Sequence, residues 1–454
     1  MVDVVLVNVP HSFIGTLYGK SDEIFFYPPL GILYLASSLR EHGYDVAVLD
    51  APTMQLTMED LTWRILQYDP KIIGLSATTP QAKSTVQLAN ALSQHGYNGK
   101  TVLGGSHATL DQRFMAKYPY FDVLFQGEAE VTFPNIIEHI KSGSLDGTVI
   151  KGESPKNLDS LPFPARDLTD LKSYFVPIYS EKFTAILASR GCPYRCSFCC
   201  RPCVPRTMRF RSPENIRDEI RECREQFNLK YFQFVDDIFG LNRKATFELL
   251  ELLKSLDIQF GFQTRVELLR DEAYVETLRN AGCREISLGI ESGDEQIRKI
   301  NGKPFSDETI QQTIDLCHKY DIEVNSFYII GLIGETETTV ATSICHPKAM
   351  KTDYIEFHII VPYPQTEIFQ HALNEQALTA DIWDKHISGD LAEQPIYIPK
   401  ALTRDFMVQA QREAYRNFYF NPHYVMKRLL KDFSSPNKLR QDFRTAITLA
   451  KNFL

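Results

Sequence analysis

The sequence predicts an α/β protein with two parallel sheets: first a doubly wound, Rossmann-like sheet, then a partial (β/α)6 barrel of the TIM-like type, with a helical C-terminal tail. Apolar, strand-like runs alternate with helix-like runs from residue 3 to residue 143, and the same alternation restarts at residue 183. A proline-containing stretch without a clear period separates the two regions. Such alternation is typical of parallel sheets whose faces are covered by helices.

The first domain, residues 1–143, is expected to hold five strands. The run DVVLVNV (3–9) is continuously apolar and β-branched, as in a strand buried on both faces. Further strands are expected at 45–50, 72–77, 101–105 and 122–127, with helical spacing at 31–43, about 57–67, 81–96 and 132–143. The strands end in small or polar residues, which would meet at the carboxyl edge of the sheet, where open α/β sheets bind ligands.

The remaining chain is divided into a linker, a barrel and a tail. Residues 144–180 are expected to form the linker, because they carry four prolines and no period. The barrel, 181–374, has strands at 183–189, 231–237, 260–266, 285–293, 323–331 and 354–364, fewer than the eight of a closed barrel. The tail, 375–454, reads as polar and helical, and its aromatics at 415, 418 and 419 fit either a pocket wall or core packing.

Composition excludes several classes of protein. The net charge of −8 disfavours a nucleic-acid or anionic-membrane surface. No apolar run reaches the ~18 residues of a membrane-spanning helix, and the N-terminal run is too short for a signal peptide. A cytoplasmic, reducing location is therefore expected, in which clustered cysteines indicate metal or redox chemistry before disulfides.

Such a cluster follows the first barrel strand, in GCPYRCSFCC (191–200) and Cys203. Cys192, Cys196 and Cys199 are spaced by three and then two residues, and three thiolates suit a soft metal. An iron–sulfur cubane normally takes four ligands, so three would leave one iron open. Structural zinc on Cys196/Cys199 and Cys200/Cys203 is the alternative, although zinc pairs usually enclose a longer loop.

The segment from Cys192 to Cys199 resembles the three-cysteine signature of the radical S-adenosylmethionine (SAM) enzymes. The segments YPPLGILYLASSLREHGYDVAVLDA, GGSHAT, GEAE, FVDDIFGLNR, LGIESGDEQIRKINGK, GLIGETETT and PYPQTE resemble the branch with an N-terminal cobalamin-binding domain. The resemblance extends over nearly the whole chain. It implies three cofactors: a 4Fe-4S cluster on Cys192, Cys196 and Cys199, S-adenosyl-L-methionine on its open iron, and cobalamin.

The resemblance also implies residues that bind SAM. Phe198 would contact the adenine, one of Asp236 and Asp237 would accept a hydrogen bond from the SAM amino group, and Arg265 would pair with its carboxylate. Glu291 would contact SAM hydroxyls, and Gly331 follows the next strand. Alternatives stay open: packing for Phe198, a structural pair for the two aspartates, and a salt bridge between Arg265 and Glu291. Cys200 and Cys203 could be spectators, a radical or redox partner, or an extra metal ligand.

Cobalamin is expected at the carboxyl edge of the first sheet. No Asp-x-His-x-x-Gly segment supplies a histidine to cobalt, which leaves the lower ligand undefined but not the cofactor. His107 can equally be a hydrogen-bonded structural residue, and the domain could have kept its fold without the cofactor. The predicted contacts are Pro10, Ser76, Thr78, Thr79, Pro80, Gln81, Gly104, Gly105, Ser106, His107, Gln126, Gly127 and Glu128.

The resemblance implies a methyltransferase that methylates an unactivated carbon of a small molecule or peptide, through a 5′-deoxyadenosyl radical and methylcobalamin. The alternative is the same set of cofactors without methyl transfer, in cyclisation, ring contraction or transfer of another SAM-derived group. A third class is a non-catalytic, zinc-bearing binding protein. An external electron donor of the flavodoxin or ferredoxin type is expected as a partner, and nucleic acid is not.

Overall fold

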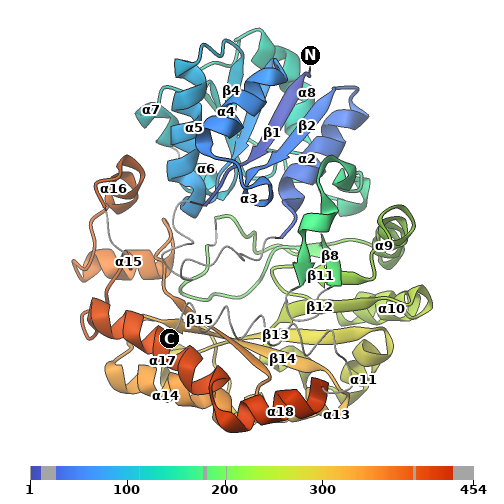
Figure 1. Cartoon of the computed structure of the whole chain (residues 1–454), viewed down its shortest axis with the longest axis vertical. Coiled ribbons are helices and arrows are strands. Elements are labelled where there is room, and N and C mark those ends of the chain that lie inside the picture. Colours follow the sequence, from blue (N-terminus) through green and yellow to red (C-terminus); the bar gives the residue numbers. More distant parts are fainter. Residues whose placement is uncertain are drawn as a thin grey trace. The chain divides into compact units, whose positions relative to one another are not determined.

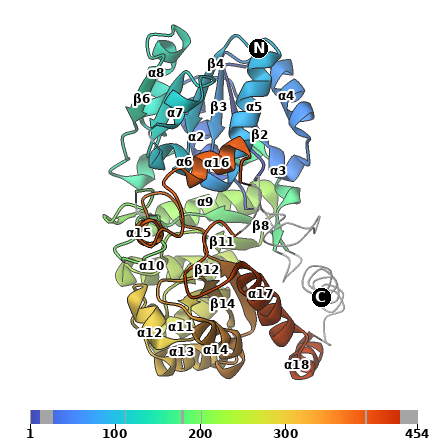
Figure 2. The same ribbon diagram turned by 90° about the vertical axis from the view of Figure 1, so that its left-hand side faces the viewer.

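The computed structural model describes residues 2–11, 27–111, 113–176, 181–200, 202–391 and 395–432. These residues form two compact units, shown from two sides in Figures 1 and 2. The first unit contains residues 2–11, 27–174 and 381–391, and the second contains 175–176, 181–380 and 395–432. Both units are of the predicted α/β type, which confirms the expected fold class.

The first unit is built on a six-stranded parallel sheet with the order β2-β1-β3-β4-β5-β6. From β1 the chain first adds β2 on one side and then β3 on the other. The carboxyl ends of β1 and β3 are therefore the topological switch point, where doubly wound sheets bind ligands. The strands are β1 Val4–Asn8, β2 Val46–Asp50, β3 Ile72–Ser76, β4 Lys100–Gly104, β5 Val123–Gln126 and β6 Thr148–Lys151.

Helices cover both faces of this sheet because its strands are apolar on both sides. Val5 and Val7 of β1 belong to a core with α4 and α5, whereas Val4 and Leu6 belong to a core with α2 and α8. The helices of this unit are α2 Leu30–Glu41, α3 Ala51–Met54, α4 Met58–Gln67, α5 Ala82–Gln94, α6 Ser106–Leu110, α7 Phe114–Lys117, α8 Thr132–Lys141 and α16 Ile382–Ser388.

The structure differs from the sequence analysis at two places in this unit. The expected linker contains β6, which pairs with β5 at the edge of the sheet; its four residues are mostly exposed, so no buried pattern marked it as a strand. The expected tail contributes α16, which contacts α5, and Ile387 of α16 is buried in the core of the first unit. Short 3₁₀ turns lie at η1 Thr79–Gln81, η2 Leu158–Ser160, η3 Arg166–Leu168 and η4 Leu171–Ser173.

The second unit holds the predicted partial barrel, with the strand order β15-β14-β13-β12-β11-β8-β7. Six of these strands are parallel, and only β7 at the edge is antiparallel. The strands are β7 Phe175–Val176, β8 Glu181–Ile186, β11 Tyr231–Phe234, β12 Gln259–Thr264, β13 Cys283–Glu291, β14 Glu323–Ile330 and β15 Tyr354–Ile359. A separate antiparallel pair, β9 Ser189–Arg190 and β10 Arg209–Phe210, brackets the cysteine loop.

Capped helices connect these strands. Ser212 accepts a hydrogen bond from the Asn215 amide at the start of α9, as its Ser-Pro sequence predicts. The helices are α9 Pro213–Phe227, α10 Arg243–Leu253, α11 Glu272–Asn280, α12 Glu295–Ile300, α13 Asp307–Lys319, α14 Glu337–Ala349, α15 Glu367–Asn374, α17 Arg404–Tyr419 and α18 Pro422–Asp432, with η5 Lys254–Leu256 and η6 Val266–Leu269.

Helix α17 covers the open edge of the barrel sheet. Figure 1 shows α17 beside β15, and side chains of the helix satisfy the unpaired backbone of that strand. The Tyr415 hydroxyl accepts from the Phe357 amide, and Gln411 Nε2 donates to the Phe357 carbonyl. The Tyr419 hydroxyl both accepts from and donates to the backbone of Ile355. These tyrosines therefore close the edge and protect it from pairing with other chains.

Candidate active site

The cysteine loop begins directly after β9, at the carboxyl end of the first parallel strand of the barrel. Its backbone is fixed by a close crossing: the Cys192 amide donates to the Pro205 carbonyl over 2.9 Å. Gly191, with φ of 104°, permits this crossing, since a Cβ there would lie 2.7 Å from the carbonyl oxygens of Pro205 and Thr207. The Cys199 amide donates to the Cys196 carbonyl, which turns the loop back on itself.

A turn after α12 seats the middle of the loop. Ser197 is buried, its hydroxyl donates to Asn301 Oδ1 over 2.5 Å, and its amide donates to the Asn301 carbonyl. Asn301 Nδ2 in turn donates to the carbonyls of Ile297 and Ile333. Gly302 lies against the loop, since a Cβ there would be 2.4 Å from the Arg195 carbonyl oxygen. The cysteines therefore sit on a rigid, hydrogen-bonded support.

Arg265, predicted to bind SAM, lies beside the cysteine loop. Its guanidinium is 3.5 Å from Cys196 Sγ, donates to the Gly302 carbonyl and lies 4.0 Å from the centre of the Tyr194 ring. Its ion pair is with Glu267, at 2.8 Å, and not with Glu291 as the sequence alternative supposed. Arg265 Nε is buried and has no partner among the described residues. A cation held at this place can attract an anionic group bound at the cysteines.

The chemistry of the three thiols fits a bound cationic group. Burial, followed by the negative charges of Cys196 and Cys192, raises the pKa of Cys199 to about 12. Burial is also the largest cause that raises the pKa of Cys192, and Cys196 and Asp237 add to it. Thiolates at these buried positions would be costly, and a bound iron cation would compensate their negative charge. No three His, Cys, Asp or Glu side chains within the described ranges converge tightly enough to hold a single metal ion.

Cys200 and Cys203 form a pair next to this trio. The Cys203 amide donates to the Cys200 carbonyl over 3.2 Å, which closes a turn, and the two thiols hydrogen-bond to each other. All five cysteines of the loop are reduced and half-buried. Within the loop, the hydrogen-bonded pair of Cys200 and Cys203 is thus distinct from Cys196, which lies beside Arg265.

Asp236 and Asp237 follow β11 and organise the strand end that leads to the cysteines. Asp236 is buried, and its carboxylate accepts from the Ala188 amide over 3.1 Å and from the Ser189 hydroxyl over 2.6 Å. Asp237 is exposed and accepts from the Gly191 amide over 2.9 Å. The two carboxylates thus point to different places, as expected of neighbours on an extended chain. Burial raises the pKa of Asp236 to about 7.

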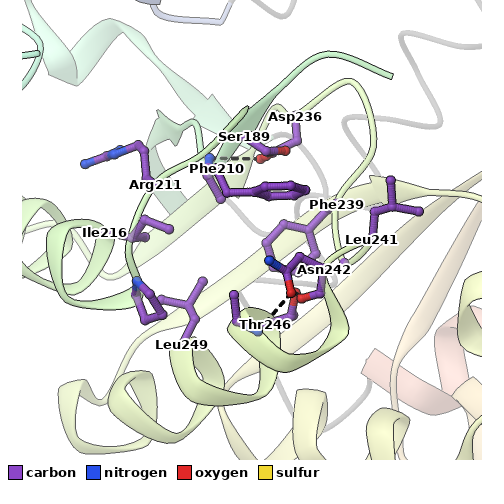
Figure 3. Close-up of a pocket in the computed structure, with 14 residues that line it drawn as sticks. Ser189, Phe210, Arg211, Ile216, Asp236, Phe239, Leu241, Asn242, Thr246 and Leu249 are labelled. Atoms are coloured by element: carbon purple, nitrogen blue, oxygen red, sulfur yellow. Dashed lines mark hydrogen bonds between the residues drawn. The ribbon is translucent and has the colours of Figure 1, made fainter. Parts of the chain in front are cut away.

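A small pocket lies on the helix side of Asp236 (Figure 3). Figure 3 shows the Asp236 carboxylate turned to Ser189, with Phe210 and Phe239 across the pocket. Ile216 of α9 and Leu249 of α10 complete its apolar part. None of the cysteines lines this pocket, so it is separate from the cysteine loop.

The other predicted SAM residues lie at carboxyl ends of barrel strands or in the loop itself. Glu291 ends β13 in the left-handed region, with φ of 74°, and pairs with Lys303 at 3.0 Å. Gly331 follows β14 with φ of 101°, and its amide donates to Glu335. Phe198 is half-buried in the cysteine loop. The Gly331 amide is therefore already engaged by the protein.

The carboxyl edge of the first sheet is tied together by Gln81. Its Nε2 donates to Asn8 Oδ1 and to the Val9 carbonyl, and its Oε1 accepts from the amide and hydroxyl of Thr78. Asn8 in turn donates to the buried Asp50 over 2.6 Å. Gln81 thus links β1 to β3 at the switch point, a structural role that the sequence analysis did not foresee.

Gly105 and His107 follow β4 at the same edge. Gly105 has φ of 94°, and a Cβ would lie 2.6 Å from the Ala77 carbonyl oxygen, so only glycine fits. His107 is buried against Thr79 and Phe114, and burial lowers its pKa to about 4. His107 Nε2 and Gln126 Nε2 are buried without a partner in the described chain, so the edge has polar groups to offer a ligand.

The remaining predicted cobalamin contacts lie at this edge as well, so the structure brings the whole predicted set to the ends of β1, β3, β4 and β5. Ser76, Gly104 and Gln126 are the last residues of β3, β4 and β5, and Thr79 and Gln81 are buried in η1. Pro80 lies between them in η1, and the rest lie in the loops that follow the strands or at the start of α6: Pro10, Thr78, Ser106, Gly127 and Glu128.

Comparison with known proteins assigns both units to families. The radical SAM superfamily model matches residues 186–344, and the B12 binding domain model matches residues 25–137. The first range contains the three cysteines, Asp236, Arg265 and Glu291. The second contains the carboxyl ends of β3, β4 and β5 described above.

Individual relatives span nearly the whole chain. An uncharacterized methyltransferase, PH0819 of Pyrococcus horikoshii, is 29% identical over 418 residues, which are 88% of this chain and 89% of the relative. The anaerobic magnesium-protoporphyrin IX monomethyl ester cyclase of Rubrivivax gelatinosus is 27% identical over 89% of this chain and 76% of its own.

A solved structure shares the fold of most of the chain. It is the radical SAM methyltransferase TsrM of Kitasatospora setae with cobalamin and a 4Fe-4S cluster bound; its TM-score is 0.65 at 17% identity, over 83% of this chain and 76% of that one. The expected pairing of domains is confirmed by these matches. The chain is a radical SAM enzyme of the group that carries an N-terminal B12-binding domain.

Proposed function

We propose that the protein is a cobalamin-dependent radical SAM methyltransferase that methylates an unactivated carbon of a small molecule or peptide. One observation carries the proposal: the three-cysteine loop follows the first parallel barrel strand at its carboxyl end, with Cys196 beside the Arg265 guanidinium, in a chain that also has a B12-type sheet. When bound, the cluster supplies the electron that cleaves SAM, and cobalamin supplies a cobalt that carries a methyl group.

Each part of the chain has a task in this function. Cys192, Cys196 and Cys199 would hold the cluster, and Ser197 and Asn301 would keep their loop in place. Arg265 would attract the carboxylate of SAM, because its guanidinium lies beside Cys196 and has an unused Nε. Of the two aspartates, Asp237 is the exposed one and would face the SAM amino group, whereas both oxygens of Asp236 accept from the 188–189 segment.

The relatives support methyl transfer and leave a second function open. PH0819 and TsrM are both named methyltransferases, and TsrM has been solved with tryptophan as substrate, which favours a small molecule. The cyclase of Rubrivivax gelatinosus matches 89% of this chain, as much as the methyltransferases do. The second candidate is therefore a radical reaction with the same cofactors and no methyl transfer.

The products derived from SAM distinguish the two functions. The chain is reconstituted anaerobically with iron, sulfide and cobalamin, reduced, and supplied with SAM carrying a deuterated methyl group and with candidate substrates. A methyltransferase should yield S-adenosylhomocysteine, 5′-deoxyadenosine and a deuterated product, whereas a cyclase should yield 5′-deoxyadenosine and methionine only. Absence of 5′-deoxyadenosine under reducing conditions, with the cluster assembled, would overturn both. Cys196→Ala is the negative control.

The cellular setting belongs to the same proposal. Cluster reduction needs an electron donor of the flavodoxin or ferredoxin type, which fits a cytoplasmic enzyme. No helix within the described residues has the length and apolarity to cross a bilayer. The acidic net charge of −8 disfavours nucleic acid as a partner.

A further inference from the structure

The two faces of the barrel sheet differ in chemistry. In β14 and β15, Tyr328 stacks on Phe357 and its hydroxyl bonds to His346 of α14, so this face is covered by helices. The register places Phe327 beside Glu356 on the opposite face. Four side chains on that face are only half-buried: Phe327, Ile329, Glu356 and His358. The second face is therefore accessible to a ligand.

A built cluster of hydrogen-bond acceptors lies on this accessible face. Glu356 Oε1 accepts from Asn325 Nδ2 over 2.9 Å, and Glu356 Oε2 lies 3.3 Å from His358 Nε2. Burial alone raises the pKa of Glu356, but the hydrogen bond and charge of His358 and the hydrogen bond of Asn325 hold it below its usual value. The Glu356 side chain is nevertheless 43% exposed, so an ionised carboxylate is presented to a ligand.

Two further features of the cluster point to a ligand. Asn325 is only 5% exposed, and its Oδ1 has no hydrogen-bond partner in the described part of the chain, although its amide nitrogen is fixed by Glu356. A buried carbonyl of this kind is costly unless a donor reaches it. Phe327 lies two residues beyond Asn325 on β14 and opposite Glu356 of β15. Its ring is edge-on to His358, with 6.3 Å between ring centres, and offers an aromatic surface.

The neighbouring carboxyl groups do not compete for the same ligand. Glu323 is neutralised by Arg428 at 2.9 Å and accepts from the Tyr354 hydroxyl. Burial, followed by the charges of Glu323 and Glu356, raises the pKa of Glu285 to about 8, and its Oε1 accepts from Ser287. Glu356 is therefore the exposed carboxylate of this face, next to an aromatic ring and the unused carbonyl oxygen of Asn325, and a cationic ligand would share it with His358.

We propose that Glu356, Asn325 and Phe327 form a subsite for a cationic nitrogen group of the substrate, such as a protonated amine or a guanidinium. The ionised carboxylate and the Asn325 carbonyl accept its N–H hydrogens, and the face of Phe327 attracts its charge. This inference rests on the proposed function, because it assigns the substrate class of the same barrel; the test below does not depend on turnover.

The test compares two fragments that differ in charge and little in shape. Phenethylammonium and 2-phenylethanol are titrated against the anaerobically reconstituted full chain by ligand-observed NMR. Phenethylammonium should bind, and 2-phenylethanol should bind at least about 10-fold more weakly, as expected when a charged hydrogen bond is lost. Equal binding of the two fragments, or binding of neither, would overturn the proposal.

Matched variants locate the binding. Glu356→Gln keeps the side-chain shape and should weaken phenethylammonium by about 10- to 100-fold, whereas Glu248→Gln on the exposed face of α10 removes the same charge and should change nothing. Phe327→Leu should weaken the ammonium fragment more than the alcohol. An unchanged affinity in Glu356→Gln, with a native melting temperature, would contradict the site. Failure of methyl transfer alone would instead show as missing S-adenosylhomocysteine with fragment binding intact.

Discussion

Asp353 shows how a single carboxylate joins several elements of the barrel. It is 4% exposed, and its Oδ2 accepts from His318 of α13 over 2.7 Å and from the Val324 amide of β14 over 3.0 Å. Lys427 of α18 lies 3.3 Å from its Oδ1. Burial alone raises the pKa of Asp353, but His318, the Val324 amide and Lys427 together lower it to about 2. The folded chain therefore stabilises the ionised form of Asp353 relative to its protonated form.

This lowered pKa gives the first prediction. Because the pKa falls from 3.8 unfolded to about 2 folded, the ionised form contributes about 2 kcal/mol at neutral pH. That contribution is complete above about pH 4 and is lost as the pH falls toward 2. Asp353→Asn should therefore lower the free energy of unfolding of the second unit at pH 7, measured by urea denaturation with hydrogen exchange, and the difference from the wild type should vanish near pH 2.

The exposed Asp315 on α13 is the matched control. Asp315→Asn should change stability by less than about 0.5 kcal/mol, as surface substitutions usually do. A difference between Asp353→Asn and the wild type that is independent of pH would contradict the electrostatic account.

At the scale of elements, the edge strand β15 depends on α17. The Tyr419 hydroxyl satisfies both the amide and the carbonyl of Ile355, over 2.9 and 3.1 Å. The sequence predicted a strand at 354–364 and a helical tail, but not this contact, because a tyrosine hydroxyl that caps a strand edge leaves no periodic signal.

Tyr419→Phe removes only that hydroxyl and leaves two backbone groups unpaired. It should cost about 1–3 kcal/mol in the free energy of unfolding of the second unit, and amides of β15 should exchange faster by hydrogen-exchange mass spectrometry. Tyr320→Phe, at a hydroxyl that donates to the exposed Glu272, should have a much smaller effect. Equal costs in the two variants would show that the edge bond is unimportant.

The sequence predicted elements and motifs better than it predicted partners. All eleven strands expected from apolar runs are present. They could be predicted because a strand buried in a sheet leaves an apolar run in the local sequence. Strand β6 escaped prediction since its residues are mostly exposed. Asn301 was likewise missed: it supports Ser197 across 104 positions, a contact that no local pattern encodes. The SAM contact of Arg265 stays a prediction, and its ion-pair partner is Glu267 and not Glu291.

At the scale of the whole molecule, the chain returns from the barrel to complete the first unit. Ile387 of α16 is 5% exposed in a core that includes Leu88 and Leu92 of α5. Asp384 of the same helix pairs with Lys117 at 2.5 Å, and Lys117 also pairs with Asp111. Composition gave no sign of this return, because the segment is short and polar and its partners are far away in sequence.

Ile387→Ala should therefore destabilise the first unit and not the second. The cavity should cost about 2–5 kcal/mol, and hydrogen exchange should quicken in α5 while β13 keeps its protection. Ile300→Ala, at a side chain that is 54% exposed, is the control and should leave both units unchanged. Faster exchange confined to the barrel would contradict the assignment of α16 to the first unit.

The most direct test of the account is the iron and sulfide content of the cysteine variants after anaerobic reconstitution. The wild type and the Cys200→Ser/Cys203→Ser double variant should each hold about four iron and four sulfide per chain, with matching visible and Mössbauer spectra. Cys192→Ala, Cys196→Ala and Cys199→Ala should each lose that cluster while keeping a native melting temperature of the first unit. Retention of a full cluster by any of the three, or its loss in the double variant alone, would contradict the assignment of the three cysteines as ligands.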